Sequence, residues 1–455
     1  MTERYLRNIT PDYITGAVSA CEGIRDSMVL INGPLGCKFY HGYAAGQAII
    51  KEQNLWNLRG ELRLTNAMDD KLLRSQYFAG TPQIPGSNLR YEDFVFGTRE
   101  QLRRALNDIF AERRYALFSV IQAPGTSLLG EALEGELADI SGEYGIPFLF
   151  VETPRFSENH FLGYDETMAR LLRTLLSPGT KTGPRTGRPR VNLFGLYTYQ
   201  RYLEGDLEEL TELLSLCGVD VNCAVGADCS MESFRRIPEA DANILLSPER
   251  CFETKRFLVD ALPLPILDFG CLPVGFDLTE RFVREVSGLL GTDCSPALAA
   301  IDRARARAFY HIGRQMGSQG FPRELRWAAE GEWSALYAYA DYLSGYLGIR
   351  PAALHPLYTQ CRGDGETRLR ALLEGQSCAD ALTADFSRVK DVILLGSANT
   401  IADILNYSGN VFGIETMFPS SGYIHVLPKT LLGCRGALYL LEQILNGTRL
   451  LMAWD

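Results

Sequence analysis

The stretch Met28-Val-Leu-Ile-Asn-Gly-Pro-Leu-Gly-Cys37 decides how the first part of this chain folds. Its apolar residues 28–31 predict a buried strand, and the Gly-rich turn after them ends at Cys37. A second cysteine, Cys21, ends the element before this strand. Thiolates on tight strand-to-helix turns hold iron–sulfur clusters, because small residues let the cluster approach the backbone. Cys21 and Cys37 are therefore candidate cluster ligands, and two buried structural thiols are the alternative.

The bulk composition is that of a globular protein. The chain has 455 residues, 46% of them apolar and 22% charged, which is enough for about three domains of roughly 150 residues. A formal net charge of −10 argues against a nucleic-acid partner. We expect no membrane association and no secretory signal, because no long apolar run occurs and residues 1–8 are polar. Eleven cysteines without a local framework favour a reducing compartment, so we expect a cytoplasmic protein.

Apolar strand-like runs alternate with amphipathic helical runs along the chain. Helices are expected over 99–114, 207–217, 253–261 and 333–347, and strands over 115–121, 146–151, 191–197, 243–247, 265–269, 327–330 and 391–395. Three successive βα cycles predict an α/β fold of three Rossmann-like domains, each a mostly parallel sheet flanked by helices. The predicted ranges are 1–187 for an N-terminal α/β domain with the cluster cysteines, 188–320 for a middle domain, and 321–455 for a C-terminal domain with a closing helix. The Pro- and Gly-rich segment 177–190 reads as a linker.

Ligands in such folds bind beyond the carboxyl ends of strands. Cys37, Pro124 and Ser247 all follow predicted strands. This placement favours a functional role for the Cys37 thiol. His41 is either an ordinary polar partner or a proton relay beside it. Cys217, Cys223 and Cys229 are spaced too widely and evenly for a zinc knuckle, so we expect structural thiols there. The chain has no phosphate-binding G-x-x-x-x-G-K-[ST] motif.

Several motifs in order along the chain resemble the nitrogenase component 1 family, and its β-type subunit more than its α-type subunit. The matching segments are Gly33–Cys37, Glu92–Gly97, Thr153–Phe156 with His160 and Gly163–Asp165, Pro273–Phe282, and Met417–Pro419 with Leu432–Gly433 and Gly436–Ala437. In this resemblance Cys37 stands at the second cluster cysteine and Cys21 at the first. The resemblance implies an iron–sulfur cluster shared with a partner subunit.

The departures from the family pattern are informative. Pro124 occupies the place of the third cluster cysteine, and Gln122 or Thr126 would be weak replacements for a thiolate. The shared cluster is then either [4Fe–4S] or [8Fe–7S]-like. Ser247 and Phe418 stand where the α-type subunit holds its catalytic cofactor, and neither side chain ligates iron well. The resemblance therefore places that cofactor on the partner and no catalytic residue on this chain.

The resemblance implies the β-type subunit of an ATP-dependent, nitrogenase-like oxidoreductase. Its expected partners are an α-type subunit, in an α2β2-like heterotetramer, and a homodimeric ATP-dependent iron–sulfur reductase that supplies electrons. The missing third cysteine argues against dinitrogen reductase and against the B subunit of protochlorophyllide reductase. Reductive C–S cleavage, as in methylthio-alkane reductase, is the specific expectation. The alternatives are a scaffold for assembly of a nitrogenase-type cofactor and a structural subunit with no cluster.

Overall fold

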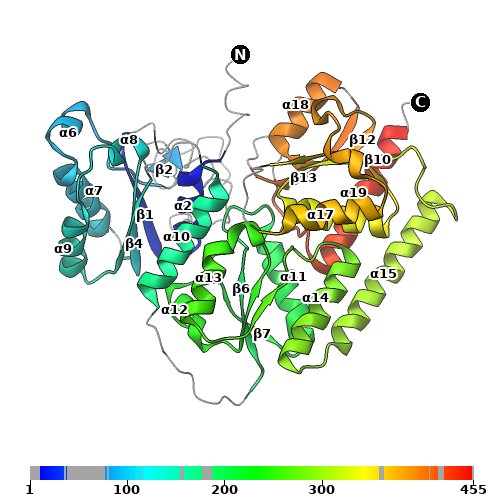
Figure 1. The fold of residues 1–455 in the computed structure, drawn as a ribbon, viewed down its shortest axis with the longest axis horizontal. Coiled ribbons are helices and arrows are strands. Elements are labelled where there is room, and N and C mark those ends of the chain that lie inside the picture. Colours follow the sequence, from blue (N-terminus) through cyan, green and yellow to red (C-terminus); the bar gives the residue numbers. More distant parts are fainter. Residues whose placement is uncertain are drawn as a thin grey trace, which may run out of the picture.

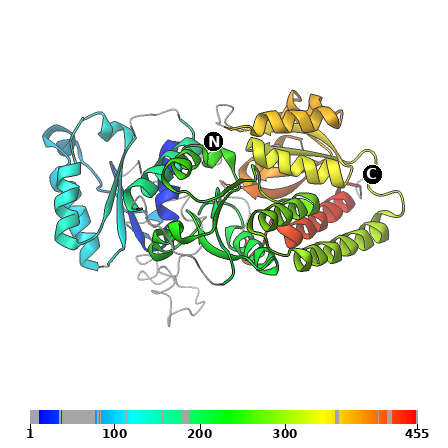
Figure 2. The same ribbon diagram turned by 60° about the horizontal axis from the view of Figure 1, so that its bottom comes forward.

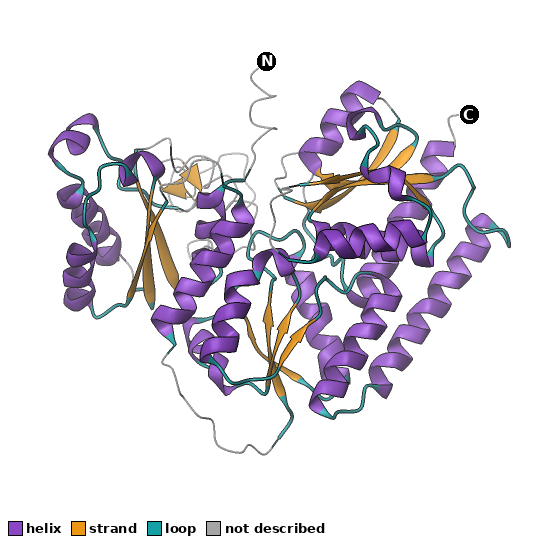
Figure 3. Cartoon of the chain, in the orientation of Figure 1, coloured by secondary structure: helices purple, strands orange, loops and turns teal. Residues whose placement is uncertain are grey.

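The described part of the chain folds into three parallel sheets flanked by helices, and one short antiparallel strand pair (Figures 1 and 3). The computed structural model describes residues 11–34, 37, 77–78, 81–82, 84–112, 114–153, 158–176, 187–357, 363–408, 410–418 and 425–452. This arrangement confirms the predicted fold class.

The N-terminal sheet has the strand order β1-β4-β5. Its strands are β1 (Ser27–Asn32), β4 (Leu117–Gln122) and β5 (Phe148–Glu152). Every residue of β1 and β4 is buried, as expected for a parallel sheet covered on both faces. One face packs on α2 (Tyr13–Glu22) and α10 (His160–Leu175), and the other on α7 (Arg99–Glu112) and α9 (Glu134–Tyr144). The remaining elements here are α6 (Tyr91–Phe96), α8 (Pro124–Ser127), β2 (Tyr77–Phe78) and β3 (Thr81–Pro82).

The middle sheet has the order β7-β6-β8-β9, and the C-terminal sheet the order β11-β10-β12-β13. The middle elements are β6 (Arg190–Phe194), α11 (Leu203–Leu216), β7 (Asp220–Ala224), α12 (Met231–Arg235), β8 (Ala242–Leu245), α13 (Phe252–Ala261), β9 (Ile266–Asp268) and α14 (Gly275–Leu290). The later elements are α15 (Ser295–Met316), β10 (Arg326–Gly331), α16 (Trp333–Ala340), β11 (Arg350–Pro356), α17 (Gly365–Gly375), β12 (Val392–Ser397), α18 (Ala398–Ser408), β13 (Val411–Met417) and α19 (Gly433–Met452). Figure 2 shows α14, α15 and α19 gathered at the end of the molecule far from the N-terminal sheet.

The observed elements follow the predicted pattern with some differences. The helix predicted over 333–347 changes after Ala340 into a π-helical turn, Asp341–Tyr346. Strands β7, β11 and β13 are not among the predicted strands, because β7 and β13 include polar residues and β11 contains two prolines. Residues 177–186 of the expected linker lie outside the described residues.

Each large sheet lies within one predicted domain range, but the hydrophobic cores cross the boundaries between ranges. One core joins α2, α10 and β1 to Phe194, Cys223 and Phe257 of the middle segment. A larger core joins the middle segment to the C-terminal one. Asp165 on α10 also accepts hydrogen bonds from the backbone N–H groups of Glu253 and Thr254, at 2.6 and 2.9 Å, and so caps α13. The three ranges stay a prediction, and their packing is continuous.

Helices α2 and α10 cross with their backbones in direct contact. A β-carbon added to Gly16 would lie 1.9 Å from the carbonyl oxygen of His160, and one added to Gly163 would lie 2.0 Å from that of Tyr13. Real β-carbons do not approach a backbone oxygen so closely, so only glycine permits this crossing. The contact fixes the start of α2 against the start of α10, where Tyr13 N donates to Glu158 O at 2.9 Å.

We predict that Gly16→Ala lowers the melting temperature, because the two helices must move apart. The expected loss is about 1–3 kcal/mol of unfolding free energy, as for other overpacked cores. Gly142→Ala in α9 is the matched control, since nothing lies within 4 Å of its added β-carbon. The control should gain roughly 0.5–1 kcal/mol from helix propensity. Equal melting temperatures for both variants would show that the crossing tolerates a side chain.

Candidate cluster site and central crevice

Cys37 lies at the carboxyl edge of the N-terminal sheet. Strands β1 and β4 are parallel neighbours with Asn32 opposite Gln122, so the turn after β1 lies beside the start of α8. Cys37 N donates to Pro34 O at 3.0 Å and closes this turn. A β-carbon on Gly33 would lie 2.8 Å from that of Ala123 and 3.6 Å from Cys37 Sγ. Glycine is therefore needed for the end of β1 to pack this closely against Ala123, whereas the distance to the thiol is an ordinary contact.

The Cys37 thiol is half-buried and lies in a negative electrostatic environment. Burial raises its pKa, and the negative charge of Asp12 at the start of α2 raises the pKa further. A neutral thiol is thus favoured in the metal-free chain. Metal binding would release its proton, because only the thiolate is a ligand.

The structure does not bring Cys21 beside Cys37, although the sequence predicts that both thiols hold one cluster. Cys21 is fully buried in the last turn of α2, and its carbonyl oxygen accepts a hydrogen bond from Ser27 Oγ at 2.7 Å. Ser27 begins β1, whereas Cys37 lies beyond the end of that strand. A strand of this length spans roughly 16 Å. The two thiols therefore lie near opposite ends of β1, because α2 and β1 run in opposite directions.

Pro124 occupies the place of the third cysteine as the first residue of α8. Gln122 shares its sheet face with Asn32, whose side chain donates to Thr98 Oγ1 at 3.3 Å on the α7 side. Alternation along the strands places Gly33 and Ala123 on the opposite face, so Gln122 points away from the side that carries Cys37. Thr126 is fully buried, and its Oγ1 has no hydrogen-bond partner among the described residues.

The site suits a cluster that is shared with another chain. Among the described residues, no three His, Cys, Asp or Glu side chains gather in a way that could hold a metal ion. Cys37 offers one half-buried thiol at the end of the strand. These residues fit the edge of an iron–sulfur cluster whose remaining ligands come from a partner. His41 lies outside the described residues.

Cys217, Cys223 and Cys229 serve the packing of the protein. Cys217 ends α11, while Cys223 and Cys229 are buried in the core between the N-terminal and middle segments. Cys229 N donates to Gly23 O at 3.0 Å, and Arg25 N donates to Cys229 O at 2.7 Å. These contacts agree with the expectation of structural thiols.

A second place where this fold can bind ligands is the central crevice, where the middle and C-terminal sheets end. Ser247 follows β8 and Phe418 follows β13, and both side chains are buried. The Phe418 ring packs edge-on against His160, Tyr197 and Tyr199, with ring centres 5.9–6.3 Å apart. Ser247 Oγ accepts a hydrogen bond from Arg250 Nη1 at 3.0 Å. Both positions are thus occupied by this chain's own packing.

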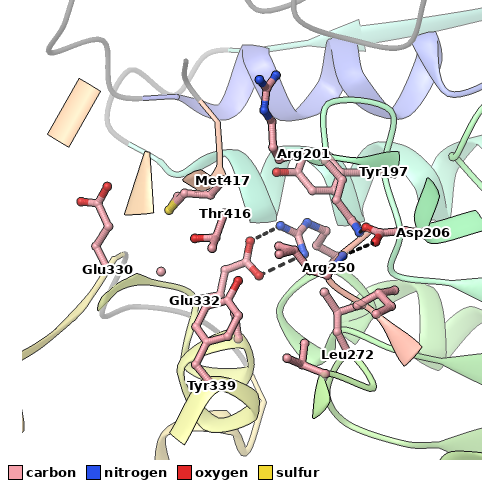
Figure 4. A pocket seen from close by; sticks show the side chains of 16 residues that line it. Tyr197, Arg201, Asp206, Arg250, Leu272, Glu330, Glu332, Tyr339, Thr416 and Met417 are labelled. Atoms are coloured by element: carbon pink, nitrogen blue, oxygen red, sulfur yellow. Dashed lines mark hydrogen bonds and ion pairs between the residues drawn. The ribbon is translucent and has the colours of Figure 1, made fainter. Parts of the chain in front are cut away.

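Arg250 fills the crevice with a buried charge network (Figure 4). Its guanidinium lies 4.0 Å from the ring centre of Tyr197 and pairs through both terminal nitrogens with Glu332. Glu249 caps α16, because its Oε1 accepts a hydrogen bond from Ser334 N at 2.8 Å. Burial raises the pKa of Glu249, and the charge of Glu332 raises the pKa further.

Little free space remains between these side chains. The described residues enclose a cavity of about 40 Å³, which has room for one or a few water molecules. The side chains named above therefore fill most of the crevice among the described residues.

Three parallel sheets, a cysteine turn at the carboxyl edge of the first sheet and a filled central crevice define the class of α/β protein to which the chain belongs. The chain belongs to the nitrogenase component 1 type oxidoreductase family, whose sequence profile matches residues 14–449.

Two sequence relatives are B subunits of light-independent protochlorophyllide reductase. The one from Synechococcus sp. (strain RCC307) is 30% identical over 230 residues, covering 47% of this chain and 42% of the relative. The one from Halorhodospira halophila (strain DSM 244 / SL1) is 32% identical over 226 residues, covering 48% and 42%. The chain thus matches less than half the length of these relatives. Nothing in these similarities points to C–S cleavage.

Solved structures share the whole fold. "Nitrogenase Cp1 at pH 6.5" has a TM-score of 0.74 at 15% identity, covering 98% of this chain and 94% of that one. "Nitrogenase Cp1 at pH 5" has a TM-score of 0.66 at 14% identity, covering 98% and 89%. Within the described residues, no helix is both long and apolar enough to span a bilayer.

We predict that Arg250→Met strongly destabilises the protein, because Glu332 is left buried without its counter-charge. The expected loss is about 3–5 kcal/mol in urea unfolding, and Arg250→Met with Glu332→Leu should recover most of it. Lys255→Met is the control, since the Lys255–Asp268 pair is exposed and should contribute less than about 1 kcal/mol. A double variant as unstable as the single one would contradict this account of the crevice.

Proposed function

We propose that this chain is the β-type subunit of a nitrogenase-like, ATP-dependent reductase and relays electrons through an interfacial iron–sulfur cluster. The proposal is carried by one observation. This chain belongs to the family, and its Cys37 turn lies at the carboxyl edge of its first sheet. The cluster, when bound, supplies single-electron transfer at a potential set by its ligands and surroundings.

The chain's own residues hold and shield that cluster edge. Gly33 lets the turn that carries Cys37 pack against Ala123 at the start of α8, and the buried Thr126 of α8 lies behind this edge. Fewer thiolates around the iron leave less negative charge there, which raises the reduction potential. The filled crevice supports an α-type partner as the place where substrate is reduced.

An exposed apolar surface beside the cluster edge supports docking of the ATP-dependent iron–sulfur reductase. We call it the α6–α8 patch, and its members are Tyr91, Val95, Phe96, Leu128 and Leu129, each at least 39% exposed. Thr98 N and Oγ1 both donate to Glu131 Oε2 at 2.8 Å, which holds the end of α6 beside the segment after α8. Figure 1 shows the two helices together at one end of the molecule. Large exposed apolar patches mark interaction sites.

We predict that Phe96→Asp weakens reductase docking. The apparent affinity for the reductase should fall about tenfold or more, as for an interface hot spot, while the cluster's electron paramagnetic resonance (EPR) signal stays unchanged. Phe309→Asp on α15 is the control, since Phe309 is equally apolar, 71% exposed and far from the patch. If the Phe96→Asp variant binds the reductase as tightly as the parent protein does, the reductase docks at another surface.

We also predict that Cys37→Ala abolishes the cluster without unfolding the chain. In the complex purified anaerobically with its α-type partner, iron and labile sulfide should fall by the share of the interfacial cluster, and the EPR signal of that cluster should disappear. Circular dichroism should stay that of the parent protein, because Cys37 lies in a half-exposed turn. Unchanged iron and sulfide in this variant would overturn the proposed function.

The substrate class separates two candidate reactions. The missing third cysteine favours reductive cleavage of a thioether C–S bond, whereas the similarity to B subunits favours reduction of protochlorophyllide. The assay supplies ATP, the reductase and each substrate in turn, and measures released thiol or hydrocarbon in one case and the pigment's absorbance in the other. A loaded complex that turns over neither substrate but donates its cofactor to a recipient apoprotein would instead be the assembly scaffold.

A further inference from the structure

The segment that leads into α19, residues 429–432, is attached to one buried face of α11. A β-carbon added to Gly205 of α11 would lie 2.0 Å from a backbone carbonyl oxygen of this segment, so the two backbones are in contact. The next residue, Asp206, accepts hydrogen bonds at Oδ1 from Thr430 Oγ1 at 2.7 Å and from Leu431 N at 3.0 Å. Asp206 is 1% exposed. A buried carboxyl group therefore joins the middle segment to the C-terminal one.

The Asp206 carboxyl group has no cationic partner among the described residues. The two arginines of the crevice are engaged elsewhere, since Arg201 pairs with Glu415 and Arg250 with Glu332. The other titratable side chains on the elements packed around it are Tyr197, Tyr202, Glu209, Glu330, Tyr339, His425, Lys429 and Arg435. Burial raises the pKa of Asp206 to about 7, and its hydrogen bonds oppose that rise.

Gln200 offers this carboxyl group a hydrogen-bond partner in either protonation state. Its Nε2 donates to Asp206 Oδ2 at 2.7 Å, while its Oε1 is buried without a partner among the described residues. A half-turn of the amide brings Oε1 to the same place, where a protonated carboxyl group can donate to it over a usual O–H···O length. Both residues line the cavity of about 40 Å³ in the crevice (Figure 4). A water molecule there can meet the other amide atom.

We propose that Asp206 is a proton-binding site at this joint, and that loss of its proton loosens the attachment of residues 429–432 and the start of α19. The proposal goes beyond the proposed function and does not depend on it. The proton leaves to solvent, and the ionised carboxylate regains its hydration when the segment opens, so opening becomes easier.

The direction of the pH dependence follows from the pKa of Asp206. Because that pKa is higher in the folded chain than its ordinary value of 3.8, the folded chain holds the proton more tightly than the unfolded chain does. The stability that the proton provides is fully present below the ordinary value and is lost as the pH rises to about 7.

The main test is Asp206→Asn in the full chain. Asparagine keeps the shape of the carboxyl group, can accept from Thr430 and Leu431, and does not titrate. The urea midpoints of parent and variant should approach each other near about pH 5, and the variant should become the more resistant as the pH rises to about 8. Asp139→Asn, which is exposed on α9, is the matched control and should follow the parent at every pH. A difference between parent and Asp206→Asn that does not change with pH would overturn the proposal.

Hydrogen exchange tests the loosening of the segment itself. After correction for the intrinsic rate, exchange in the peptide that contains Leu431 should accelerate about tenfold in the parent between about pH 6 and about pH 8, as release of one proton requires. It should stay constant in Asp206→Asn. Equal acceleration in both proteins would show that another group controls the segment.

Infrared spectroscopy keeps the proposal testable if Asp206→Asn does not fold. In the parent, a C=O band of a protonated carboxyl group should disappear as the pH rises through about 7. Thr430→Val removes a donor to Asp206 Oδ1 and should move the midpoint of this titration to higher pH, because the ionised form loses a hydrogen bond. Absence of the band in the parent, or an unmoved midpoint in Thr430→Val, would overturn the assignment of the proton to Asp206.

Discussion

The backbone contact between α2 and α10 determines where the chemistry of this protein lies. Because Gly16 and Gly163 have no side chains, the two helices meet at their carbonyl oxygens and α2 lies tightly against the first sheet. This contact sets the direction of α2, and with it the positions of Asp12 and Cys21 at the two ends of β1. The cluster edge therefore depends on a packing constraint some residues away from any ligand.

Much of the fold could be predicted from the sequence. Apolar runs such as 28–31 and 115–121 mark buried parallel strands, and their alternation with helices indicates three Rossmann-like units. The missed strands β7 and β13 include polar residues such as Asn222 and Glu415, and β11 contains prolines at its ends. In these strands the burial comes from tertiary packing, and periodicity alone gives a weak signal.

The candidate site could be predicted only in part. The Gly-rich turn identifies Cys37, because only small residues allow a thiol so close to a strand end. From the sequence alone, Cys21 looks equally suitable as a cluster ligand, because the order of residues does not say which end of the strand lies beside the cysteine of the preceding helix. The available signal was geometric: a ten-residue helix before a six-residue strand brings its first residue, not its last, to the strand's carboxyl end.

The shared cores have a mechanical consequence. Because side chains from the N-terminal and middle segments fill one core, and those from the middle and C-terminal segments fill another, a hinge between segments would expose large apolar surfaces. Hinge motion between the segments in the described part of the chain is therefore energetically unfavourable. Under the proposed function, gating of electron flow by ATP would arise in the docking protein, while this chain would hold the distance and orientation of the electron's path.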